Sequence, residues 1–124
     1  MNTALWIVQI LLAVMFLMTG MMKGFMPLEK IGERMAFVND APSWMPRLAG
    51  YSEVLGAIGL VFPMLFNIAP VLTPLAAIGL AIVMVLAAIL HFRRKEYPMI
   101  AMNAVLFALA VFVAYGRLVA APVA

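Results

Sequence analysis

The sequence contains no cysteine and a single histidine, His91, among its 124 residues. Without cysteine the chain cannot form disulfides, a thiol relay or a cysteine-ligated iron–sulfur cluster, and it cannot be S-palmitoylated. One histidine cannot supply both axial ligands of a bis-histidine haem, and a zinc site needs further ligands that the sequence hardly offers. We therefore expect no bound metal.

Charge is equally scarce. Charged residues make up 10% of the chain, whereas hydrophobic residues make up 68% and the mean hydropathy is +1.15. Because a soluble domain is about a quarter charged and half apolar, this composition disfavours a soluble protein and predicts contact with a lipid bilayer. The net charge of +3 comes from eight Lys and Arg residues against five Asp and Glu residues, too dispersed for nucleic acid binding.

Three uncharged stretches are long enough for transmembrane helices: Met1 to Met22, Val54 to Phe92 and Tyr97 to Gly116. A crossing needs about 20 apolar residues. The middle stretch would extend roughly 58 Å as one helix, so the prolines and Asn67 within it predict a hairpin turn. We predict an all-α, integral membrane four-transmembrane-helix bundle that forms a single domain over residues 1–124, with helices at about 3–24, 47–66, 70–92 and 97–118.

The connection between the first two helices, Phe25 to Pro46, has apolar residues at helical spacing on one side and charged residues on the other. This pattern predicts a short interfacial amphipathic helix between helices 1 and 2, followed by Trp44 as an interfacial anchor. A lid over a binding site is the alternative. Arg93, Arg94 and Lys95 form a second basic segment, which we expect to meet anionic headgroups, or alternatively a phosphate or an acidic partner.

The distribution of basic residues predicts the orientation. Every Lys and Arg except Arg117 flanks the first or the third connection between helices. By the positive-inside rule these basic loops are cytoplasmic, and both termini and the turn between helices 2 and 3 lie outside.

Four polar residues fall in the halves of the spans nearest the basic loops: Lys23, Glu53, His91 and Asn103. Antiparallel packing would bring a carboxylate, two basic groups and an amide to one end of the bundle, within hydrogen-bonding reach. Since polar side chains are costly in lipid, we interpret them as a ligand-binding site for the polar head of a lipophile. The alternative is a structural ion pair of Glu53 with Lys23 or His91, with Asn103 joining two helices.

Small residues share the faces of these polar residues and predict close helix packing. Gly20 lies on one face with Gln9 and Lys23, while Ser52 and Gly56 have the small-xxx-small spacing that lets helix backbones approach each other. Arg117 lies on the same face of the last helix as Asn103.

Four segments carry a family resemblance: TGMMKGF at 19–25, YSEVLGAIGLVFP at 51–63, AAILHFRRKEYP at 87–98 and AVFVAYGRL at 110–118. Their order and spacing, over essentially the whole chain, resemble those of the DoxX-like family. The resemblance implies a four-helix bundle in the bacterial inner membrane. It also carries over four positions that match the family pattern: Lys23, Glu53, Gly56 and His91.

The resemblance leaves the activity open. Some DoxX relatives are described as membrane subunits of thiosulfate:quinone oxidoreductase or of redox-stress complexes, and distant eukaryotic relatives act as assembly factors for other membrane proteins. We therefore expect an accessory or quinone-interacting subunit of a membrane redox system, without enzyme activity on its own. The alternative is a non-enzymatic assembly or interaction factor. A minimal transporter like the small multidrug resistance proteins is less favoured, because the first helix lacks the glutamate of that family.

Overall fold

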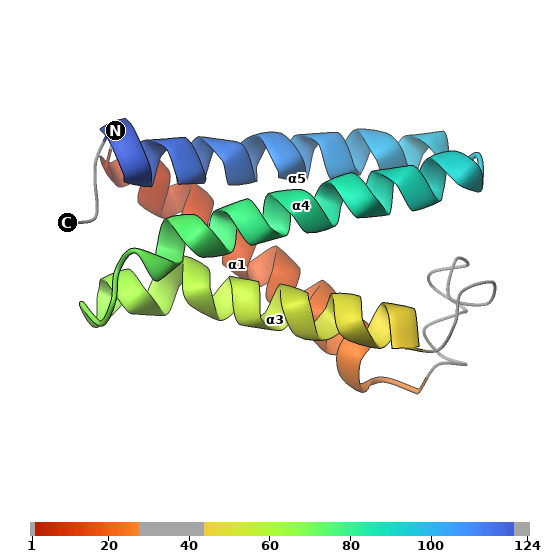
Figure 1. Ribbon diagram of the computed structural model, residues 1–124, viewed down its shortest axis with the longest axis horizontal. Helices are drawn as coiled ribbons and strands as arrows, with labels where there is room; N and C mark the ends of the chain where they lie inside the picture. The colour runs from red at the N-terminus through yellow and green to blue at the C-terminus, as the bar shows by residue number, and fades with distance from the viewer. Residues whose placement is uncertain (1, 28–43, 121–124) are drawn as a thin grey trace.

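The computed structural model describes residues 2–27 and 44–120. In these ranges the chain forms four long helices, α1 (Asn2–Phe25), α3 (Trp44–Leu65), α4 (Leu72–Arg93) and α5 (Tyr97–Tyr115), and α5 continues into a π-helical turn, η2 (Gly116–Ala120) (Figure 1). All four helices are long and apolar enough to cross a bilayer. The prediction of an all-α membrane bundle with four spans is confirmed. The predicted interfacial helix falls on residues outside the described ranges.

The helix ends agree with the predicted ends within three residues, and the largest shift at a helix start is in α3. This helix begins at Trp44 rather than Arg47, with Pro46 in its first turn. Proline is tolerated there because the first N–H groups of a helix have no intrahelical partner. Residues 66–71 form the predicted turn between α3 and α4, in which Asn67 and Ala69 have φ angles of 52° and 46°.

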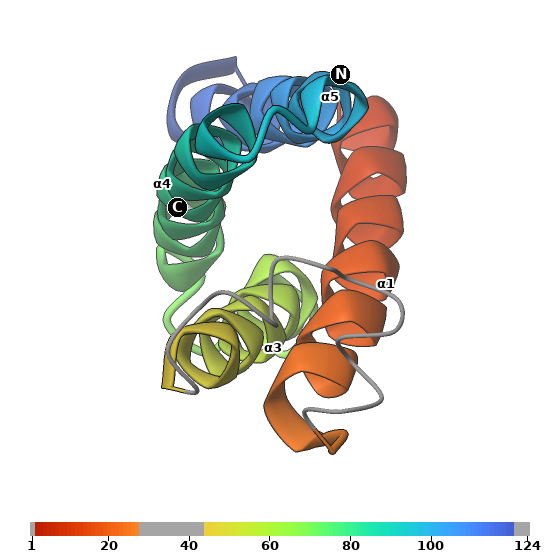
Figure 2. The same cartoon turned by 90° about the vertical axis from the view of Figure 1, so that its right-hand side faces the viewer.

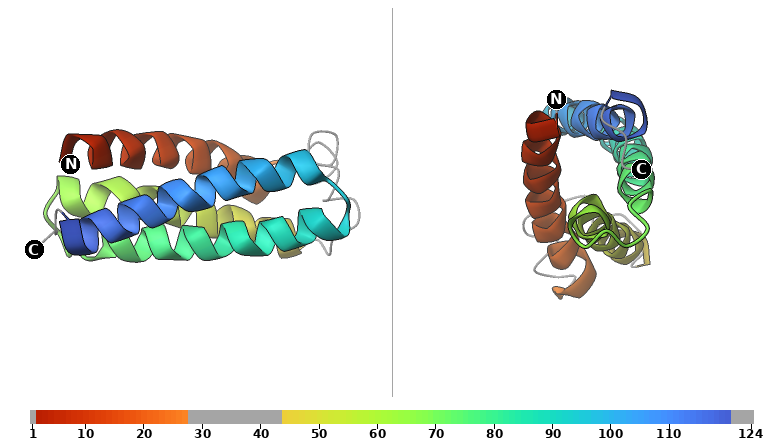
Figure 3. Two further views of the ribbon diagram at one scale, coloured as in Figure 1. Left: turned by 90° about the horizontal axis from the view of Figure 1, so that it is seen from above. Right: turned by 90° about the vertical axis from the view of Figure 1, so that its left-hand side faces the viewer.

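The four helices form a ring when the bundle is viewed along its length (Figure 2). α1 packs mainly on α3 and α4 mainly on α5, while α3 contacts α4 and α5 closes onto α1. Neighbours run antiparallel, so α1 begins and α5 ends at the same end of the bundle (Figure 3). We call this end the terminal end. We call the other end the basic end, because its described residues include Lys23, Arg47, Arg93, Arg94 and Lys95.

All four helices contribute apolar side chains to one core. Leu12, Phe16, Leu60, Leu80 and Val113 are at most 1% exposed. Many large apolar side chains are instead exposed on the outside of the ring. In a bilayer this outer surface contacts hydrocarbon, which costs such side chains nothing.

Two glycines set the crossing of α1 and α3. A Cβ on Gly50 would lie 2.8 Å from the carbonyl oxygen of Gly20, and a Cβ on Gly20 would lie 2.8 Å from the carbonyl oxygen of Gly50. The two backbones therefore touch, and only glycine fits at either position. This is the close approach that small residues permit in membrane helices.

A proline inside α3 is compensated by α4. Pro63 has no N–H and leaves the carbonyl of Gly59, four residues earlier, without its helical donor. The hydroxyl of Thr73 donates a hydrogen bond of 2.9 Å to this carbonyl. An unpaired backbone group is expensive in lipid, so this bond fixes the start of α4 against α3.

Candidate functional site

The buried polar side chains of the described residues gather at the two ends of the bundle. Glu53, His91 and Asn103 lie toward the basic end, while Gln9, Thr73 and Arg117 lie toward the terminal end. Between them the core is apolar.

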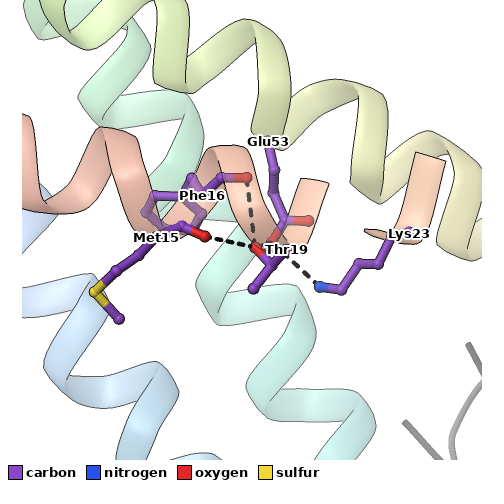
Figure 4. A network of polar contacts seen from close by, with 5 residues as sticks. All are labelled: Met15, Phe16, Thr19, Lys23 and Glu53. Carbon is purple, nitrogen blue, oxygen red and sulfur yellow. Dashed lines mark hydrogen bonds and ion pairs between the residues drawn. The ribbon is translucent and has the colours of Figure 1, made fainter. Parts of the chain in front are cut away.

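The closest of the predicted site pairs is Lys23 with Glu53 (Figure 4). The ammonium of Lys23, near the end of α1, lies 3.2 Å from Oε1 of Glu53 on α3. Thr19, one turn before Lys23, has its hydroxyl 3.5 Å from the same oxygen and 3.2 Å from the carbonyl of Met15. Glu53 is 1% exposed, and its second oxygen, Oε2, is buried without a hydrogen-bond partner.

A second contact joins the same two helices. Arg47 of α3 donates a hydrogen bond of 3.3 Å to the carbonyl of Lys23. This carbonyl belongs to the last turn of α1, where carbonyls lack intrahelical donors and a cation is favourable. Glu53 and Arg47 thus hold the end of α1 from two points on α3.

His91 belongs to a different polar group. Its Nδ1 lies 3.0 Å from Oε1 of Glu96, in the short connection between α4 and α5, and Nε of Arg94 lies 2.9 Å from the same oxygen. The hydrogen bond with His91, followed by that with Arg94, holds the pKa of Glu96 below its usual value. Among the described residues, the hydrogen bonds of His91 and those of Glu53 form two separate groups.

Asn103 lines a groove of about 530 Å³ between α4 and α5, on the basic half of the bundle. Val85, Ile89 and Phe92 are exposed along the groove, whereas Met84 and Asn103 are buried, so the groove opens toward the outside of the ring. Asn103 is 7% exposed, and its amide nitrogen is buried without a hydrogen-bond partner. The groove is therefore apolar apart from Asn103 and Arg93.

The groove continues toward the terminal end. A second cavity of about 250 Å³ lies between the same helices and shares Val85 and Phe107 with the first. The remaining residues that line it are apolar apart from Tyr115. At the basic end the larger cavity is bordered by the exposed side chain of Arg93. Together the two cavities can take an elongated apolar molecule with a polar head.

The predicted packing residues take different places. Gly20 touches α3, as described above. Gly56 faces α4, because a Cβ there would lie 2.6 Å from the side chain of Leu80. Ser52 is half-buried, and the close approach of α3 to α1 is made by Gly50 instead. The first residue of α3, Trp44, is 63% exposed at the basic end, which fits a position in the interface.

The group of polar side chains at the terminal end was not predicted from the sequence. Nε of Arg117, in η2, donates a hydrogen bond of 2.6 Å to Oε1 of Gln9 in α1, and Nη1 donates one of 2.7 Å to Asn2. Gln9 in turn donates a hydrogen bond of 2.7 Å to the carbonyl of Leu60 in α3. Their positions in the spans could have indicated this contact. Gln9 lies near the start of the first span and Arg117 near the end of the last, so antiparallel packing brings both to the same end of the bundle.

The fold and the buried polar residues together define a multi-pass membrane protein built as a ring of four antiparallel helices. Residues 7–113 match the DoxX-like family, and the chain belongs to that family. Neither the curated proteins nor the solved structures include a match to this chain.

Proposed function

We propose that this chain is an accessory subunit of a membrane redox system and binds a quinone, or a comparable lipophile, in the groove between α4 and α5. The observation that carries the proposal is that Asn103, whose amide nitrogen is buried without a hydrogen-bond partner, lines a groove that is apolar apart from this residue and Arg93. Leaving a buried donor unpaired costs about 1–3 kcal/mol. A carbonyl oxygen of a quinone ring accepts such a hydrogen bond and would remove that cost.

The shape of the groove supports a membrane-soluble ligand. Its volume of about 530 Å³ falls in the range of about 300–1,000 Å³ that is usual for small-molecule sites. It opens where the bilayer surrounds the bundle, so a ligand dissolved in the membrane can enter without crossing water. The second cavity extends the groove toward the terminal end and suits the apolar tail of such a ligand.

The other predicted ligand residues take supporting roles in this proposal. Lys23 and Glu53 hold α1 against α3, and neither lines the groove. His91 and Glu96 fix the connection between α4 and α5, and therefore the spacing of the two helices at the polar end of the groove. The pair of Lys23 with Glu53 corresponds to one form of the structural alternative weighed from the sequence, whereas the contact of His91 with Glu96 was not predicted.

We further propose that the protein lies in a bacterial inner membrane with its basic end in the cytoplasm. Lys23, Arg47, Arg93, Arg94 and Lys95 all lie at this end, whereas Arg117 lies toward the other. This charge asymmetry supports the orientation by the positive-inside rule. A fusion reporter that is active only in the cytoplasm should be inactive when attached at the C-terminus.

The binding proposal is tested by mass spectrometry of the small molecules retained by the protein purified in mild detergent. We expect about one quinone per wild-type chain and a loss of about tenfold in Asn103→Leu, since one hydrogen bond in an apolar site contributes about 1.4 kcal/mol. Ala104→Phe leaves Asn103 in place but fills the groove, and should also abolish retention. The matched control is Glu53→Gln, which changes a buried polar residue outside the groove and should retain the quinone.

Two results would contradict the proposal. One is retention by Asn103→Leu and Ala104→Phe at the wild-type level, and the other is wild-type retention no higher than that of an unrelated four-span protein. Absence of a ligand, together with reproducible co-purification of one specific membrane protein, would instead favour the assembly-factor alternative.

A further inference from the structure

The terminal end of the bundle contains a buried cation whose partners are neutral. Arg117 is 2% exposed, although it lies in a membrane span. Its two hydrogen-bond acceptors are the side-chain amides of Gln9 and Asn2, and its guanidinium lies 5.6 Å from the ring centre of Trp6. These groups orient the guanidinium and leave its charge uncompensated.

Much of the donor capacity of this guanidinium is unused. A guanidinium carries five N–H groups, one on Nε and two on each terminal nitrogen. Nε is used by Gln9, one N–H of Nη1 is used by Asn2, and Nη2 is buried without a partner. Both N–H groups of Nη2 are therefore without an acceptor among the described residues.

No carboxylate in the described part of the chain compensates this charge. Glu53 is paired with Lys23, and Glu96 lies at the basic end, beside His91. A charge buried in a membrane protein is costly unless it is paired. The cost is avoided if an anion from outside the chain binds at this site.

We propose that Arg117 binds a phosphate-type oxyanion at the terminal end of the bundle, either the phosphate of a lipid headgroup or a free phosphate. Arginine pairs with phosphate through two parallel N–H···O bonds, and the unpartnered Nη2 offers its N–H groups for such contacts. Neutral amides, rather than carboxylates, hold the guanidinium in place, so its charge stays available for the ligand. This site lies at the opposite end of the bundle from the polar end of the groove and does not depend on the quinone proposal.

The backbone supports a dedicated site at this position. Arg117 lies in η2, the one π-helical turn of the described chain. A π turn shifts the direction of the side chains that follow it, and such turns occur frequently at functional sites. Gly116 allows the turn to pack directly on Leu5 of α1, since a Cβ at Gly116 would overlap that side chain. Arg117 also lies within one turn of the end of its span at Val119, where lipid phosphates are located.

The test is native mass spectrometry of the full chain in detergent with three probes: dioleoylphosphatidylglycerol, inorganic phosphate, and dioleoylglycerol, which has the same acyl chains without phosphate. We expect one phosphatidylglycerol or one phosphate per chain, and no retained dioleoylglycerol. Binding of phosphatidylglycerol alone identifies a lipid headgroup as the source, whereas binding of inorganic phosphate identifies a free anion. Equal retention of all three lipid and phosphate probes, or retention of none, would overturn the proposal.

Variants separate this site from general electrostatic attraction. Arg117→Gln should weaken binding about tenfold or more, whereas Lys95→Gln removes the same charge at the basic end and should bind like the wild type. If Arg117→Gln does not fold, Gln9→Glu keeps the test decisive. It places a carboxylate 2.6 Å from Nε without changing the side-chain shape, and by neutralising Arg117 it should weaken binding to a similar extent. Wild-type affinity in Gln9→Glu would also overturn the proposal.

Discussion

The ion pair between Lys23 and Glu53 offers the sharpest test of how this bundle is held together. The substitution Lys23→Met keeps an unbranched apolar side chain of similar length and removes only the ammonium. The nearest remaining donor to Glu53 would be the hydroxyl of Thr19, 3.5 Å from Oε1, whose single proton is also within reach of the Met15 carbonyl at 3.2 Å, while Oε2 has no partner in the native bundle either. A carboxylate that is 1% exposed would be left almost without compensation.

The expected loss follows from the geometry. At the observed separation of 3.2 Å, two unit charges interact by about 5 kcal/mol if the effective dielectric constant is about 20. Removing one member of a buried pair typically costs about 3–5 kcal/mol. Because Thr19 remains, we expect Lys23→Met to lower the free energy of unfolding by about 3 kcal/mol. Glu53→Gln should cost less, about 1 kcal/mol, since the amide oxygen can still accept from Lys23 and the remaining ammonium is the less buried member of the pair, with its side chain 13% exposed.

A double-mutant cycle isolates the interaction of the two side chains. The four proteins are the wild type, Lys23→Met, Glu53→Gln and the double variant, each unfolded by a denaturing detergent in mixed micelles and followed by circular dichroism. We expect the double variant to be more stable than Lys23→Met alone, since it contains no unpaired charge. Stability of Lys23→Met within about 0.5 kcal/mol of the wild type would refute the reasoning and show that Glu53 is compensated in another way.

Three further predictions concern packing, a backbone carbonyl and pH. Gly50→Ala should destabilise the bundle by about 1–3 kcal/mol, because the new Cβ would lie 2.8 Å from a carbonyl oxygen of α1. Its control, Gly79→Ala, has nothing within 4 Å of the new Cβ and should raise the free energy of unfolding by about 0.5–1 kcal/mol. Both effects are measured from the unfolding midpoint. Thr73→Val should cost about 1–3 kcal/mol in the same assay, since it leaves unpaired the carbonyl of α3 that proline frees. The hydrogen bond with His91 lowers the pKa of Glu96 from its usual 4.5. The stabilisation that the ionised Glu96 contributes is therefore complete above pH 4.5 and is lost as the pH falls through the lowered pKa. In a pH titration of the unfolding midpoint, Glu96→Gln should lack this pH-dependent loss.

The four spans could be predicted because the bilayer requires each helix that crosses it to be both long enough and apolar enough. Each span needs about 20 residues with internally satisfied backbone groups, and the charged residues mark where the spans stop. The predicted start of α3 at Arg47 lies three residues after the observed start at Trp44, because a cation is tolerated in the first turn of a helix near the interface.

The site was harder to predict, because helical periodicity shows which face of a helix a residue lies on but not which residue it contacts. The sequence offered Lys23 and His91 as alternative partners of Glu53, and in the structure the partner is Lys23. The sequence could not show that the His91 imidazole would form a hydrogen bond with Glu96, only five residues later, in the short connection before α5. Nor could the sequence show that Asn103 lines a groove, because the groove depends on the distance between α4 and α5.

The separation of the two polar ends also bears on which functions the bundle can perform. Thr19, beside Glu53, and Gln9, beside Arg117, are ten residues apart on α1, which corresponds to about 15 Å along the helix axis. The interior positions between them on this helix, Leu12 and Phe16, are at most 1% exposed and pack against apolar residues of the other helices. A transported solute or proton needs polar groups along its path, and the buried side chains of the described core between the two ends are apolar. By contrast, the groove between α4 and α5 is reached from the bilayer without opening this core, so the arrangement favours lateral binding of a lipophile over transport through the ring.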